Sequence, residues 1–214
     1  STFVVGLPDG GFFLDWHDSK PGGVAHSYAS ELRSDFWDFN ASSGVNQDCV
    51  RAYMAAGGDI AECFFAEHTV SFIKTPFFIL QSVVDDWQLQ NELGDYSPAP
   101  VNAYRLAATS RLLGPASRSN LGGFIDSCKH HCGYWAQIVI NGTLMSDAFS
   151  IWYGEQLAAW RQVEVATSKR WWWQAKEYPC SACCGAQSFS TPQERNWYSM
   201  KINGAFTAES NIVV

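Results

Sequence analysis

Basic side chains are scarce in this sequence. Lys and Arg total 14 among 214 residues, no basic run occurs, and the formal net charge is −7. Nucleic-acid binding depends on basic side chains that neutralise phosphates, and anionic membrane surfaces attract the same side chains. The sequence therefore predicts no nucleic-acid partner and disfavours binding to an anionic membrane.

Long hydrophobic runs, repeats and low-complexity linkers are also missing. A membrane-spanning helix needs roughly 20 apolar residues, whereas the longest apolar run, around TPFFIL, has the length of a strand. Hydrophobic residues nevertheless make up 47% of the chain and charged residues only 16%, which is typical of a globular protein with a large core. The length allows two small domains, but we predict a single domain over residues 1–214.

Cysteine, by contrast, is frequent. Seven cysteines in a chain of this size favour an oxidising compartment. Two N-x-S/T sequons make Asn40 and Asn141 candidate glycosylation sites and point the same way. The chain begins with Ser1 and has no signal-peptide profile, so we expect a mature product or a fragment of a longer precursor. A secreted or otherwise oxidised location is therefore predicted.

Short apolar runs alternate with helix-like stretches. The runs at 2–7, 75–83 and 122–125 are typical of strands buried on both faces of a parallel sheet. NQDCVRAYMAAGG, PVNAYRLAATSRLLG and SDAFSIWYGEQLAAWR have helix start or stop signals, including Ser146 as an N-cap. This alternation predicts an α/β fold.

Two segments, 8–46 and 162–200, have no clear periodicity and are predicted to be long loops tied down by packing and disulfides. Residues 162–214 form a Cys- and Trp-rich tail that we expect to pack on the domain. Its Trp171–Trp173 run favours a core or interface position over a platform for stacking on sugars.

Polar side chains follow two of the predicted strands. Asp85 and Asp86 follow the run at 75–83, and His130 and His131 follow the run at 122–125. In parallel sheets chemistry gathers at the carboxyl ends of the strands. The order of acid before histidine is the one that α/β hydrolases use, with a nucleophilic serine earlier in the chain.

Larger motifs carry a family resemblance. The segments are LPDGGFFLD, ECFFAEHTVSFIKTPFFILQSVVDDWQLQNEL, GGFIDSCKHHC, DAFSIWYGEQ and YPCSACC. From about residue 3 to residue 184 the chain resembles the pectin acetylesterase family, which also includes the Notum carboxylesterases. The resemblance implies the carboxy-terminal half of an α/β-hydrolase-like sheet and secreted serine esterase chemistry without a cofactor. It also implies esters of polysaccharides or glycoproteins as substrates.

The same motifs assign the acid and the base. The acid of the family's D-x-W-Q motif corresponds to Asp85, and the base of its S-C-x-x-H-C motif corresponds to His131. Because neighbouring side chains in a strand-to-loop turn point apart, we expect Asp86 and His130 to face elsewhere. Asp126 lies close in sequence to His131 and is an alternative partner for its ring.

The nucleophile is missing from this sequence. No G-x-S-x-G occurs in the 214 residues, whereas the family carries its serine in such an elbow upstream of the D-x-G-F-F-L-D segment. We expect the serine elbow and the remaining sheet on an upstream segment or a second chain, packed beside the strand at 2–7. The alternative is a catalytically inactive structural or binding subunit of a larger assembly.

The cysteines near the predicted base can be used in two ways. A zinc site built from Cys128, Cys132 and the two histidines fits poorly, because Cys-x3-Cys lacks a second paired-ligand motif. We therefore predict no metal and a disulfide for each of these two cysteines, with partners elsewhere. The other predicted bridges are Cys49 with Cys63, and Cys180 with Cys183 or Cys184. The seventh cysteine is free or pairs outside the chain.

Overall fold

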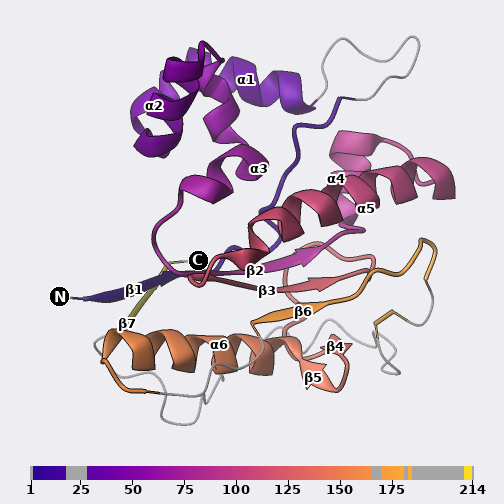
Figure 1. The fold of residues 1–214 in the computed structure, drawn as a ribbon. Coiled ribbons are helices and arrows are strands. Elements are labelled where there is room, and N and C mark those ends of the chain that lie inside the picture. The colour runs from indigo at the N-terminus through magenta and orange to yellow at the C-terminus, as the bar shows by residue number, and fades with distance from the viewer. Residues whose placement is uncertain (1, 18–27, 165–169, 181–182, 185–209, 214) are drawn as a thin grey trace.

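A parallel β-sheet forms the centre of the computed structural model (Figure 1). The structure describes residues 2–17, 28–164, 170–180, 183–184 and 210–213. The sheet has five strands in the order β6-β3-β2-β1-β7, and every neighbouring pair is parallel. Their bounds are β1 Phe3–Gly6, β2 Phe77–Ser82, β3 Leu121–Asp126, β6 Trp171–Trp173 and β7 Ser210–Val213. The predicted α/β class and the three predicted strands are confirmed.

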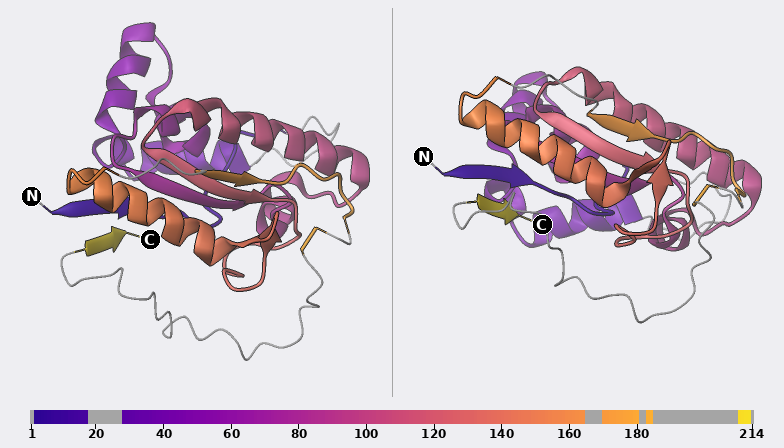
Figure 2. Two further views of the ribbon diagram at one scale, coloured as in Figure 1. Left: turned by 60° about the horizontal axis from the view of Figure 1, so that its bottom comes forward. Right: turned by 90° about the horizontal axis from the view of Figure 1, so that it is seen from below.

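Alternate side chains of the central strands pack into two different cores. Phe78 and Leu80 of β2 face α6 (Met145–Trp160), with Phe149 and Trp152 of that helix. Phe77 and Ile79 face α5 (Pro98–Leu113) on the opposite side. Figure 1 shows α5 above the sheet and α6 below it. In the right view of Figure 2, seen from below, α6 lies in front of the sheet. Because both faces are covered, β2 and β3 are buried throughout, as their continuous apolar sequences predict.

Close packing of α6 on β3 requires a glycine. A Cβ on Gly122 would lie 2.6 Å from Cδ1 of Trp152, well inside van der Waals contact. The largest side chain of the α6 core can therefore approach the strand only where no side chain stands.

A group of short helices connects β1 to β2. It comprises α1 Tyr28–Asp38, η1 Ala41–Ser43, α2 Gln47–Ala56, η2 Ile60–Phe64, α3 Ala66–Thr69 and η3 Val70–Phe72. Helix α2 was predicted, and Asn46 caps it by accepting hydrogen bonds from two backbone amides. The prediction of a long loop over residues 8–46 is wrong, because α1 lies within it. Only Ala29 and Phe36 of α1 are buried, so its apolar periodicity is weak in the sequence.

The remaining elements lie between β2 and the end of α6. They are α4 Asp86–Gln88, the π-helical η4 Leu89–Leu93, η5 Gly114–Ser117, and an antiparallel hairpin of β4 Val139–Ile140 and β5 Thr143–Leu144. Helix α6 was predicted, but it begins one residue before Ser146 and has Leu144 at its N-cap, so the predicted cap is wrong. Among the described residues, no helix is long and apolar enough to cross a membrane.

Both edges of the sheet differ from the prediction. Trp171–Trp173 is not part of a loop but forms the edge strand β6, with Trp172 buried and Trp173 half exposed. On the other side, β7 pairs with β1 over four residues, from Phe3 with Ser210 to Gly6 with Val213. The edge of β1 that we expected a second chain to cover is thus paired within the chain. Most of the predicted tail over 162–214 lies outside the described residues.

Candidate active site

The candidate site lies where β2 and β3 end. The two strands pair in register from Phe77 with Leu121 to Ser82 with Asp126, and the amide of Val83 donates to the Asp126 carbonyl at 2.9 Å. The turns that follow the two strands are therefore held side by side. One carries Asp85, and the other carries His131.

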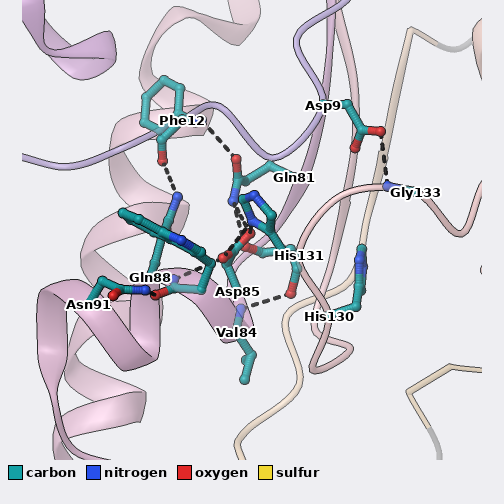
Figure 3. Close-up of polar contacts among 12 residues, drawn as sticks. Asp9, Phe12, Gln81, Val84, Asp85, Gln88, Asn91, His130, His131 and Gly133 are labelled. Atoms are coloured by element: carbon teal, nitrogen blue, oxygen red, sulfur yellow. Dashed lines mark hydrogen bonds and ion pairs between the residues drawn. The ribbon is translucent and has the colours of Figure 1, made fainter.

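Asp85 and His131 are in hydrogen-bond contact. Nδ1 of His131 lies 2.9 Å from Oδ2 and 3.0 Å from Oδ1 of Asp85 (Figure 3). The Asp85 side chain is fully buried, whereas the His131 ring is 36% exposed. Asp85 also caps α4 by accepting from the Gln88 amide at 3.0 Å. With Nδ1 turned to the carboxylate, the other ring nitrogen of His131 is left for proton transfer.

Opposing influences set the pKa of Asp85. Burial raises it above its usual range and is the largest effect. The hydrogen bonds from the Gln88 amide and from His131 lower the pKa, as do the positive charges of His131 and His130. The buried Asp85 carboxylate thus depends on these hydrogen bonds and positive charges to stay ionised.

The neighbours of the acid and the base turn elsewhere. The Asp86 carboxylate is half exposed and pairs with Lys129 at 3.0 Å. The His130 ring is only 3% exposed and lies 3.1 Å from the Asp126 carboxylate through Nε2. Asp126 therefore holds His130 and not His131, so the alternative pairing weighed from the sequence is not the one in the structure.

Two residues of the segment after β1 support the His131 loop. Oδ2 of Asp9 accepts from the Gly133 amide at 3.0 Å and from the Trp135 indole at 2.9 Å. Gly10 has φ +69°, and a Cβ there would lie 3.1 Å from Cε1 of His131. Neither role was predicted from the sequence. The available signal was the turn-forming dipeptide Asp9-Gly10 directly after an apolar run.

A hydrogen-bonded chain also runs behind the acid. The Phe12 amide donates to Oε1 of Gln81, and Nε2 of Gln88 donates to the Phe12 carbonyl. Nε2 of Gln81 lies 3.4 Å from Oδ2 of Asp85. Gln81 is buried within β2. A polar residue in an otherwise apolar strand indicates buried hydrogen bonds, and this signal in the sequence was overlooked.

Three disulfides are present, and they correct one prediction. Cys49 bonds to Cys63, Cys128 to Cys184, and Cys180 to Cys183. All seven cysteines are in the described part of the chain, and Cys132 is the free one, so its predicted bridge is wrong. The three cysteines of the tail, Cys180, Cys183 and Cys184, are all paired already. Burial and the charges of Asp9 and Asp85 raise the pKa of the Cys132 thiol.

One group of side chains has the spacing of metal ligands, away from the candidate site. Atoms of Asp15, Glu62 and His68 lie within 4.8 Å of one another. The guanidinium of Arg33, however, bonds to both carboxylates. We therefore regard this group as an ion-pair network between the segment after β1 and the helices.

The two sequons lie at the surface. Asn40 is exposed before η1, and Asn141 is exposed in the turn between β4 and β5. Both have positive φ, 49° and 50°, as asparagine tolerates in turns. Their glycosylation stays a prediction.

A parallel sheet between helices, with an acid and a histidine following adjacent strands, is the arrangement of an α/β-hydrolase-like fold. The model of the pectinacetylesterase family matches residues 1–109, and the chain belongs to this family. Pectin acetylesterase 11 of Arabidopsis thaliana is 23% identical over 179 residues, which cover 70% of this chain and 44% of that protein.

Solved structures show the same fold. Two crystal forms of the Wnt deacylase Notum from Drosophila match with TM-scores of 0.60 and 0.59 at 20% and 21% identity. The matches cover 83% of this chain and 49% and 50% of those chains. The chain therefore spans about half the length of these relatives.

Proposed function

We propose that this chain is the carboxy-terminal half of a carboxylic ester hydrolase that removes acetyl or longer acyl groups from polysaccharides or glycoproteins. The hydrogen bond between the buried Asp85 and the half-exposed His131 is the observation that carries the proposal. Family membership supports ester hydrolysis as the reaction. The three disulfides support an extracellular or otherwise oxidising location.

In this mechanism Asp85 holds His131 with Nδ1–H directed at the carboxylate. Nε2 of His131 then accepts the proton of a serine hydroxyl as that oxygen attacks the ester carbonyl. The resulting imidazolium is stabilised by Asp85, and it returns the proton to the leaving alcohol. Water repeats the cycle on the acyl-enzyme, so no cofactor is required.

The serine would come from polypeptide outside this sequence. None of the 214 residues forms a G-x-S-x-G elbow, and the matched part of this chain covers only 44% of pectin acetylesterase 11 and 49% of Notum. We propose an upstream segment or a second chain that carries the elbow and further sheet. Because β7 pairs with β1, that polypeptide either replaces residues 210–213 at this edge or packs elsewhere. Intact-mass measurement of the native protein with and without reductant distinguishes one long chain from two.

Hydrolysis of an acetyl ester by the native protein tests the acid and the base. We expect Asp85→Asn and His131→Gln each to lower kcat on the order of 10³- to 10⁴-fold, because the imidazole loses its orientation or its proton acceptor. Asp86→Asn is the matched control, because this exposed carboxylate forms an ion pair with Lys129 and the variant should retain near-normal activity. Equal losses for Asp85→Asn and Asp86→Asn would refute the assignment.

A catalytically inactive binding subunit is the second candidate. Large apolar side chains are exposed on the helical group between β1 and β2, namely Trp37, Phe39 and Met54. Such side chains mark an interaction surface where they form one contiguous apolar patch. Native protein that hydrolyses no ester, and whose upstream polypeptide lacks a serine elbow, would favour this candidate.

A further inference from the structure

A second histidine–aspartate pair lies beside the proposed catalytic pair. Nε2 of His130 contacts both carboxylate oxygens of Asp126, at 3.1 and 3.2 Å. Both side chains are buried, unlike His131, so this pair has no access to a substrate. Figure 3 shows the His131 ring directed at Asp85, while the His130 ring lies on the other side of the loop. The His130–Asp126 pair can therefore influence catalysis only through the Asp85–His131 pair.

Backbone contacts connect the two pairs. The carbonyl of His130 accepts a hydrogen bond from the Asp86 amide at 3.0 Å, which fixes the turn that presents Asp85. Asp126 ends β3, where its carbonyl accepts from Val83 and its Oδ1 accepts from the Cys128 amide at 2.8 Å. Movement of the second pair would thus move both the turn that carries Asp85 and the loop that carries His131.

The charges of the two pairs are also coupled. Burial opposes the cationic form of His130, but the charge and hydrogen bond of Asp126 outweigh it, with help from the charge of Asp85, so the pKa of His130 is raised. The positive charge of His130 in turn lowers the pKa of Asp85. Another titratable side chain, Tyr134, lies against this ring, with the two ring centroids 5.0 Å apart. Lys129 on the same loop is paired with Asp86 at the surface.

We propose that Asp126 and His130 form a positioning pair, in which the buried imidazolium keeps Asp85 ionised and its backbone fixes the turn of Asp85 against His131. The sequence of charges across the site is then negative on Asp126, positive on His130 and negative on Asp85. The catalytic meaning of this arrangement rests on the proposed function. The effect of the positioning pair on the Asp85–His131 contact is independent of the proposed function, because that contact lies within this chain.

The test is a pH titration of the full chain by NMR, with ¹³C-labelled aspartate and ¹⁵N-labelled histidine. The Asp85 carboxyl shift reports the ionisation of the acid, and the ring nitrogens report each histidine. In His130→Gln, whose amide can still donate to Asp126, we expect the Asp85 midpoint to rise, because a positive charge that lowers the pKa of Asp85 is lost. Lys129→Gln is the matched control and should leave the midpoint in place, because that ammonium is exposed.

An unchanged Asp85 midpoint in folded His130→Gln would overturn the proposal. The wild-type chain provides a second test that needs no variant, since His130 must titrate above the ordinary histidine value of 6.5. Titration at or below 6.5 would also overturn it. In Asp126→Asn the His130 midpoint should fall. These readouts do not depend on ester hydrolysis, so loss of the proposed function and loss of the positioning role are separately detectable.

Discussion

Glu92 is predicted to make the stability of the protein fall as the pH rises. The residue is only 7% exposed, and its buried Oε1 has no hydrogen-bond partner among the described residues. Burial, which is the largest effect, raises the pKa from 4.5 to about 8, although the hydrogen bond from Tyr104 opposes the shift. A protonated Glu92 can donate to the Tyr104 hydroxyl, which then donates to Oε1 of Gln88.

The sign of the pH effect follows from these two values. The folded state holds the Glu92 proton up to about pH 8, whereas the unfolded chain releases it near 4.5. Raising the pH through this window therefore lowers the free energy of unfolding, by on the order of 3 to 5 kcal/mol at one pKa unit per 1.4 kcal/mol. Below pH 4.5 this group contributes no pH dependence, and above 8 its destabilisation is complete.

Urea unfolding of wild type and Glu92→Gln from pH 4 to pH 9 measures the effect. The neutral amide retains a donor for Tyr104, so the variant should gain stability over wild type as the pH rises, with the difference levelling above pH 8. Glu31→Gln, at an exposed position of α1, is the matched control and should follow the wild-type slope. A difference between wild type and Glu92→Gln that does not change with pH would refute the buried-proton account.

Three further predictions concern the cysteines and the His131 loop. Thiol titration of the unfolded, non-reduced chain should detect one thiol, and none in Cys132→Ser; two or more in wild type would contradict the three bridges. Asp9→Ala should lower the free energy of unfolding by about 1 to 3 kcal/mol, because the Gly133 amide and the Trp135 indole lose their acceptor; an unchanged urea midpoint would argue against this anchor. Gly10→Ala should displace the His131 ring, since the new Cβ meets it in a strained backbone conformation, and an unaltered NMR signal of the Nδ1 proton would contradict that close approach.

Strong local signals made part of this structure predictable. The central strands have continuous apolar sequences, and α2 begins with an asparagine cap and ends at Gly57 in the left-handed conformation. Parallel strands that pair in register bring their carboxyl ends to the same edge of the sheet, so the acidic and histidine pairs could be expected to meet there. The choice of Asp85 and His131 within those pairs came from the family resemblance. Their catalytic roles stay predictions.

The features that were missed depend on tertiary contacts. Three tryptophans in a row have no strand periodicity, yet they form β6 because β3 offers an edge to pair with. Spacing could not show that Cys184 reaches Cys128 while Cys132 stays free. The ion pair of His130 with Asp126 requires the loop to turn back on the strand end, and no local pattern reports such a turn.

Mapping the serine labelled by a fluorophosphonate tests the central claim most directly. The proposed split of the triad predicts covalent labelling of the native protein at a serine outside these 214 residues, in a glycine-flanked elbow. Labelling should require His131 and be lost in His131→Gln, because the serine then has no base to accept its proton. A native protein that is never labelled, or is labelled at a serine within this sequence, would contradict the claim that Asp85 and His131 serve a nucleophile carried elsewhere.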